Sequence, residues 1–191
     1  SRLDHLPAPE KQLCKKAAVF ATAFSEPALE ALELTEPARH LGALAKRGLV
    51  SARRGGTEGH VYRFRSSLVA DVAYRMNTDE ARGELHRMAA AFLERAPGVD
   101  REELARHLAL GGEPARAAAA YAQAAFEASV RGDGSSVLRC ADRALELGVE
   151  GGTACELHLA RADALSFGGD KEARRAALDA ALACAVDDAQ R

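Results

Sequence analysis

The feature that most constrains the fold is how the chain supplies its apolar side chains, which are mainly alanine and leucine at helical spacing. Tryptophan is absent and aromatic residues make up 5% of the sequence, so few side chains suit a large sheet. Small side chains let neighbouring helices approach closely. They recur in the second half of the chain at Ala118, Ala122, Ala125, Ala141, Ala144, Ala160, Ala164, Ala173, Ala177 and Ala181. This pattern predicts a mainly α-helical protein.

Short joints containing glycine separate the helices of this alanine-rich part. They lie at residues 111–112, 132–134, 151–152 and 168–170. Two helices joined by so few residues must lie antiparallel. The second half of the chain is therefore expected to consist of antiparallel helical pairs.

The joints also indicate an internal repeat. Gly132 and Ala144 match Gly169 and Ala181 at an offset of 37 positions, close to the roughly 34-residue period of tetratricopeptide repeats. We therefore expect residues 78–191 to form about three helical pairs of a tetratricopeptide-like superhelix, in an array that continues beyond this chain. An irregular alanine-rich helical bundle is the alternative.

The first fifty residues predict three short helices. Apolar residues at helical spacing place the first within Leu13–Phe24. The second begins at Ser25–Pro27, where a capping hydroxyl and an acidic side chain precede a proline. Thr35–Pro37 repeats this pattern and starts the third helix, which ends at Gly48.

The period then changes from helical to strand-like. Leu49–Arg54 and His60–Ser66 alternate as strands do, and the glycine-rich Gly55–Gly59 between them suits a hairpin loop. Three helices followed by a hairpin is the order of a winged helix, whose third helix and hairpin are often presented to DNA. We expect a winged-helix domain with a small β-hairpin wing over residues 1–77, followed by a helix that Thr78 caps.

Basic side chains concentrate in the same region. Seven occur between Thr35 and Arg65 against only Glu36 and Glu58, although the whole chain has a net charge of -2. They are Arg39, Lys46, Arg47, Arg53, Arg54, Arg63 and Arg65. This set predicts a docking surface for an acidic protein domain or for DNA, or else solvated wing residues. The third helix has few polar groups that could reach base edges, which favours docking to protein.

No motif in the sequence indicates catalysis. It has no G-x-x-x-x-G-K-[ST] phosphate loop, no H-E-x-x-H and no G-x-S-x-G. The six histidines share no metal-ligand spacing, and the four cysteines form no C-x-x-C pair. We therefore expect no catalytic, cofactor-binding or metal site in this chain, and we expect that it is not an enzyme by itself.

The sequence also favours a cytoplasmic protein. No apolar run approaches the ~18 residues of a membrane span, and no signal peptide opens the chain. The cysteines lie in apolar helical stretches, where free thiols act as small buried hydrophobes in a reducing compartment. Because the chain begins without methionine and almost directly at its first helix, we expect it to be part of a longer protein.

Several runs of residues resemble one class of bacterial signalling proteins. They are Arg2–Pro7, Ala17–Phe20, Leu41–Leu44, Gly48–Val50, Tyr62–Tyr74 and Leu85–Arg87. Together they resemble the region that follows the ATPase core in bacterial signal-transduction ATPases with numerous domains, the STAND class. This class includes large transcriptional regulators and the ATPase regions attached to some serine/threonine kinases and adenylate cyclases. The resemblance covers residues 1–148.

The resemblance implies an order of domains. A P-loop ATPase would come first, then a winged helix that packs on it and helps to hold the closed, ADP-bound state, then a superhelical sensor for an inducer or partner. Relatives often carry a histidine after the Phe-Arg of the second wing strand, where a histidine can touch the nucleotide. This chain has Ser66 there, so we do not expect nucleotide binding at that residue.

These observations predict a non-catalytic regulatory and protein-interaction fragment of a larger signalling ATPase. Its winged helix would dock on the ATPase core, and its helical repeats would bind a protein partner or inducer. One alternative is a winged-helix DNA-binding transcriptional regulator with a helical-repeat interaction domain. Another is a protein-interaction scaffold without a nucleotide-dependent switch.

Overall fold

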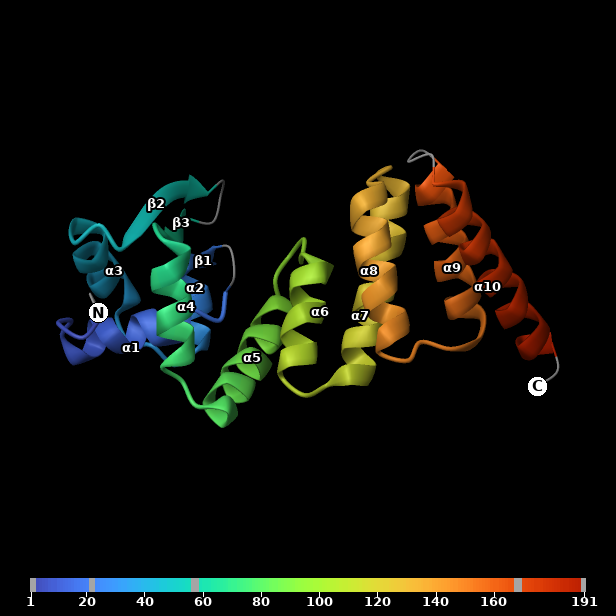
Figure 1. Cartoon of the computed structure of the whole chain (residues 1–191). Helices are drawn as coiled ribbons and strands as arrows, with labels where there is room; N and C mark the ends of the chain where they lie inside the picture. The colour runs from blue at the N-terminus through green and yellow to red at the C-terminus, as the bar shows by residue number, and fades with distance from the viewer. Residues whose placement is uncertain (1–2, 21–22, 56–58, 167–169, 190–191) are drawn as a thin grey trace. The chain divides into compact units, whose positions relative to one another are not determined.

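The computed structural model describes residues 3–20, 23–55, 59–166 and 170–189. Within these residues the chain is mainly α-helical, as its composition predicts, and it has a small three-stranded antiparallel sheet (Figure 1). The chain divides into two compact units, residues 1–95 and 96–191. In the part that is described, no helix combines the length and the apolar character needed to cross a membrane.

The first unit contains five helices and three short strands among its described residues. They are α1 (Ala8–Ala17), β1 (Phe24–Ser25), α2 (Glu26–Ala31), α3 (Pro37–Lys46), β2 (Val50–Gly55), β3 (Gly59–Phe64), α4 (Ser67–Arg75) and α5 (Asp79–Leu93). The predicted order of three helices followed by a β-hairpin is therefore present.

Two helices of this unit begin at the caps that the sequence predicts. The Ser25 hydroxyl accepts a hydrogen bond from the backbone N–H of Ala28 at 3.3 Å, at the start of α2. The Thr78 hydroxyl accepts one from the backbone N–H of Ala81 at 3.2 Å, at the start of α5. Each hydroxyl satisfies a donor that the first helical turn leaves free.

The prediction that Thr35 caps the third helix is wrong. The residue before α3 is instead Glu36, which has a left-handed φ of 48° and makes no side-chain capping bond. Pro37 occupies the first turn, where its fixed φ suits the helix and it has no N–H that needs an acceptor. Proline thus starts this helix without the expected hydroxyl.

The sheet has the strand order β1-β3-β2, and both pairs are antiparallel. β2 and β3 form the predicted hairpin; residues 56–58 of its loop lie outside the described residues. β1 was not predicted, because the apolar spacing assigned Phe24 to the first helix, which ends at Ala17. The Phe24 ring instead stacks on that of Tyr62, with 6.3 Å between the ring centroids, and lies tilted against that of Phe64 at 5.5 Å. A two-residue strand is too short to show alternation.

The core of the first unit includes α5. Leu13, Leu41 and Leu44 are fully buried in it, and Leu85 and Ala89 of α5 belong to the same cluster. The sequence placed the domain boundary between residues 77 and 78, whereas the compact unit extends to residue 95. The physical reason is that the apolar side of α5 packs into this core.

The second unit contains five helices among its described residues. They are α6 (Arg101–Leu110), α7 (Pro114–Val130), α8 (Gly134–Glu146), α9 (Gly151–Ser166) and α10 (Lys171–Ala189). Each helix packs against the next in the chain. Gly132, in the joint between α7 and α8, has a φ of 73°, which glycine adopts without steric cost.

The predicted offset of 37 positions is present in the helices. α7 and α9 begin at Pro114 and Gly151, and α8 and α10 begin at Gly134 and Lys171, so both starts are shifted by 37. The pair α9–α10 thus repeats the pair α7–α8 in register.

Alanine side chains fill the contacts between these helices. Ala117, Ala125 and Ala128 of α7 and Ala141 and Ala144 of α8 are all 0% exposed. Their small side chains leave room for close approach of the helices, and apolar burial drives the packing.

Candidate functional site

The third helix presents one apolar and one basic side. Leu41 and Leu44 are 0% exposed and anchor α3 in the core. Arg39, Gly42 and Lys46, at helical spacing on the other side, are exposed. A Cβ added at Gly42 would meet no atom within 4 Å, so this side of the helix is open. Two basic side chains, two turns apart, therefore flank a flat stretch of helix.

The hairpin places two arginines on its outer face. Tyr62 and Val50 are buried, so the residues that alternate with them lie on the opposite face of the strands. In the register, Arg53 pairs with Val61 and Arg63 with Ser51. Arg53 and Arg63 are therefore diagonal neighbours on that face.

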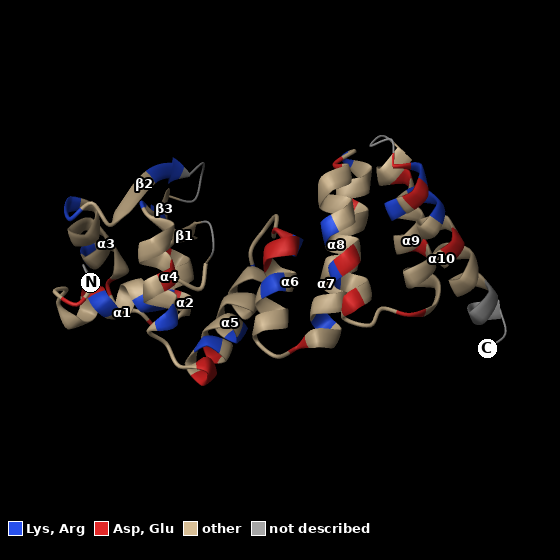
Figure 2. Cartoon of the chain, viewed as in Figure 1, with Lys and Arg blue, Asp and Glu red and all other residues tan. Residues whose placement is uncertain are grey.

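Arg65 connects this face to the end of α3. Its backbone N–H bonds to the carbonyl of Leu49 at 3.0 Å, which extends the pairing of the hairpin. A Cβ added at Gly48 would lie 3.9 Å from its guanidinium. We call Lys46, Arg53, Arg63 and Arg65 the basic surface; Figure 2 shows basic residues on β2 and at the end of α3.

These four side chains, and that of Arg54, make no ion pair within the described residues, although all five are exposed. Arg54 pairs with His60 and lies on the other face of the hairpin. Arg39 lies two turns from Lys46, and its Nη1 is 3.9 Å from Oε2 of Glu36. The structure thus places three of the seven predicted basic residues, Arg53, Arg63 and Arg65, on one face of the hairpin, and a fourth, Lys46, exposed near the end of α3.

Arg47 has a structural role instead. Its Nε lies 3.1 Å from Oε2 of Glu10, whose side chain is only 10% exposed. The buried carboxylate needs a nearby positive charge, because burial without one is costly. Arg47 therefore joins the end of α3 to α1. The sequence did not distinguish it from the other six, because Glu10 lies far away along the chain.

A tyrosine fixes the hairpin to the helices beneath it. The Tyr62 hydroxyl donates to Oε1 of Glu26 in α2 at 2.9 Å. Burial, and then the hydrogen bond to this carboxylate, raise the pKa of Tyr62 above its usual value. The bond holds the phenol protonated and sets the position of β3 relative to α2. Ser66, after the hairpin, is exposed and makes no capping bond at the start of α4.

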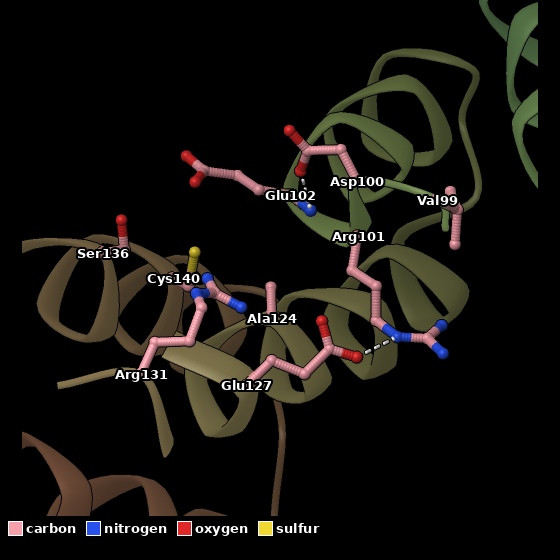
Figure 3. Close-up of a pocket in the computed structure, with 9 residues that line it drawn as sticks. All are labelled: Val99, Asp100, Arg101, Glu102, Ala124, Glu127, Arg131, Ser136 and Cys140. Carbon is pink, nitrogen blue, oxygen red and sulfur yellow. Dashed lines mark hydrogen bonds and ion pairs between the residues drawn. The ribbon is translucent and has the colours of Figure 1, made fainter. Parts of the chain in front are cut away.

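The second unit has a cavity of about 340 Å³. Figure 3 shows the side chains around it, which come from the start of α6, the end of α7 and the start of α8. The lining residues are Val99, Asp100, Arg101, Glu102, Ala124, Glu127, Arg131, Ser136 and Cys140. None of them was predicted from the sequence as a site residue, because they approach one another only when the three helices pack.

Most charges around the cavity are paired. Nε of Arg101 lies 2.5 Å from Oε1 of Glu127. Arg139 donates to both oxygens of Glu102, at 2.6 and 2.8 Å, and this lowers the pKa of the Glu102 carboxyl. Asp100 accepts from the backbone N–H groups of residues 102 and 103 and so caps the start of α6.

Cys140 contributes its thiol to the lining of the cavity. Burial, and then the nearby Glu102 carboxylate, raise its pKa to about 12. A thiol that stays protonated at neutral pH is a poor nucleophile. The cavity therefore suits the binding of a polar group better than covalent chemistry.

The described residues contain no group of three or more His, Cys, Asp or Glu side chains that could hold a metal ion. Two of the histidines are buried where helices pack together. His86 is 1% exposed, with Nε2 2.9 Å from the Tyr74 hydroxyl, and His107 is 0% exposed.

Comparison of the chain with protein-family models, with curated proteins and with solved structures gives no match.

Proposed function

We propose that this chain is a regulatory and protein-interaction part of a larger signalling ATPase. Its first unit is proposed to be a winged helix that docks on the ATPase core, and its second unit a tetratricopeptide-like array that binds a protein partner or inducer. The observation that carries the proposal is the basic surface, in which four exposed cations have no ion-pair partner within the described residues.

Electrostatics supports an acidic partner for this surface. Like charges gathered on one face repel one another, so an acidic surface that covers them is attracted and steered into place. The strand register fixes the backbone positions of Arg53 and Arg63, which suits a defined docking geometry. The cavity of the second unit, with both signs of charge in its lining, is the place proposed for a polar group of the partner or inducer.

The docking proposal is tested by charge reversal in the protein that contains this chain. Arg53→Glu combined with Arg63→Glu should release bound fluorescent ADP several-fold faster, because docking would no longer favour the closed state. Arg75→Glu with Arg95→Glu is the matched control, since both arginines are exposed in the same unit but lie outside the basic surface. Equal ADP release rates in both variants, or a parent protein that has no nucleotide-binding loop, would refute the proposal.

A second candidate function is DNA binding, which the exposed cations on α3 and on the hairpin favour. Binding to DNA should weaken steeply with salt, by an amount set by the phosphate contacts. Against this candidate, the open side of α3 carries Ala38 and Gly42, which have no side-chain group that could hydrogen-bond to a base edge. Anisotropy titration of a labelled duplex decides the matter: salt-sensitive binding that the Arg53/Arg63 variant abolishes would favour DNA as the partner.

A further inference from the structure

The internal repeat gives each residue of α8 an equivalent residue in α10. Because both helices begin 37 positions apart, Ala141 corresponds to Leu178, Asp142 to Asp179, Ala144 to Ala181 and Leu145 to Leu182. Figure 1 shows α8 followed by α9 and then by α10. The surroundings of α8 can therefore be compared with those of α10, position by position.

One side of α8 is covered by α9. A Cβ added at Gly134 would lie 3.6 Å from the Cβ of Ala164 in α9, and Nε of Arg161 lies 2.7 Å from Oδ1 of Asp142. Gly134, Leu138, Ala141 and Leu145 follow one another at helical spacing along this side. Ala141 is 0% exposed as a result.

The equivalent side of α10 is open. Leu178 is 42% and Leu182 is 66% exposed, whereas Ala177 and Ala181, on the side toward α9, are 2% and 5% exposed. Large apolar side chains four residues apart on an exposed helix side form a stripe that another helix can cover. We call Leu178, Asp179 and Leu182 the α10 stripe.

Charge defines what kind of helix would fit. Asp179, the equivalent of Asp142, has a side chain that is 73% exposed, with only a loose contact at 3.9 Å to Arg175. It can take a cation as Asp142 takes Arg161. At the start of α10, Lys171 is the equivalent of Gly134, which lies next to Ala164 of α9. In a helix that covers α10 as α9 covers α8, the residue equivalent to Ala164 would therefore lie near the ammonium group of Lys171.

We propose that the α10 stripe binds an amphipathic α-helix that carries an arginine or lysine and, three residues later, an acidic residue. The apolar side of this helix covers Leu178 and Leu182. Its cation pairs with Asp179, and its carboxylate lies near Lys171. The stripe is separate from the basic surface and from the cavity, so this inference does not depend on the proposed function.

The probe is a labelled synthetic peptide with the sequence of residues 151–166 and the change Ala164→Glu, titrated into the full chain. It should bind with saturable fluorescence anisotropy, and Leu182→Asp in the protein should weaken binding by about tenfold or more. Val130→Asp is the matched control, because Val130 is 90% exposed and lies on another helix. Both substituted residues are exposed, and far-UV circular dichroism would verify that each variant is folded.

Charge exchange makes the test specific. Asp179→Arg should abolish binding of this peptide and restore it when the peptide also carries Arg161→Glu. The proposal is overturned if the peptide fails to bind below about 1 mM, or if Leu182→Asp and Val130→Asp bind it equally. It is also overturned if sedimentation velocity shows a dimer of this chain that Leu182→Asp dissociates, because the stripe then serves a second copy.

Discussion

The guanidinium of Arg139 donates two hydrogen bonds to the carboxylate of Glu102, at 2.6 and 2.8 Å, although the residues are 37 positions apart. The pair joins α8 to α6 across α7, at the edge of the cavity. It is therefore a link between two elements that are not consecutive in the chain. Its geometry leads to two predictions on the stability of the second unit.

Glu102→Gln should destabilise the second unit by about 0.5–1 kcal/mol, the upper part of the range for exposed pairs, because the contact is bidentate. Solvent screens it, since the side chains of Arg139 and Glu102 are 54% and 35% exposed. Urea unfolding of both single variants and of the double variant with Arg139→Gln measures the coupling. Additive effects of the two substitutions would contradict the prediction.

The contribution of this pair should depend on pH. The folded-state pKa of Glu102 lies below its usual value of 4.5, so the stabilisation is fully present above that pH and is lost as the pH falls through the folded-state value. Burial raises the pKa of Glu103 and acts in the opposite direction. The measurement is therefore the difference in unfolding free energy between the wild type and Glu102→Gln, which should shrink toward zero below pH 4.5. A difference that stays constant with pH would argue against the ion pair.

Arg47→Met should cost about 1–3 kcal/mol of stability in the first unit, because it leaves the buried Glu10 carboxylate without its cation. Arg53→Met, which removes an exposed arginine of the basic surface, should change stability by less than about 0.5 kcal/mol. Thermal or urea unfolding distinguishes the two. Equal losses of stability in the two variants would mean that the Arg47–Glu10 contact does not stabilise the first unit.

Cys14 and Cys140 should resist alkylation in the folded protein. Burial raises the pKa of each thiol to about 12, so on the order of one in 10⁴ is ionised at pH 8, and the two residues are only 0% and 1% exposed. Cys184, which is partly exposed, serves as the internal comparison. Mass spectrometry after a short iodoacetamide pulse should find Cys184 modified before Cys14 and Cys140, which should react only in urea. Rapid labelling of Cys140 in the native chain would show that the packing around α8 opens.

Ala125→Leu should destabilise the helical array by about 1–3 kcal/mol, because a larger side chain does not fit where α7 meets its neighbours. Ala125 is 0% exposed, whereas Ala119 on the same helix is exposed. Ala119→Leu is therefore a control with the same chemistry and nearly the same helix propensity. Circular dichroism melts compare the two variants. A melting temperature for Ala125→Leu that equals that of Ala119→Leu would mean that the array is loosely packed.

Local features were predictable from the sequence for a physical reason. Helical spacing, the caps at Ser25 and Thr78 and the glycine joints depend on residues that are near one another in the chain. The offset of 37 positions was readable in the same way, since equivalent residues share equivalent local patterns. The hairpin followed from alternation on either side of a glycine-rich loop.

Other features depended on contacts between distant residues. The apolar pattern of α5 would be the same if this helix packed in the first unit or in the helical array of the second. Only the contacts of Leu85 and Ala89 show that α5 belongs to the core of the first unit. The two-residue strand β1 exists only because β3 lies beside it. Arg47 and Arg53 look alike in the sequence, but one has a buried carboxylate within 3.1 Å and the other does not.

The spacing of alanine and leucine along the sequence thus determined that the chain is helical. It also determined where the helices repeat. Spacing defines which side of each helix is apolar, but not what covers that side. The tertiary structure decided that α9 covers Ala141 of α8 while the equivalent Leu178 of α10 stays exposed. The reason is that burial is a property of packed helices, and the same local pattern can be covered in one helix and open in the next.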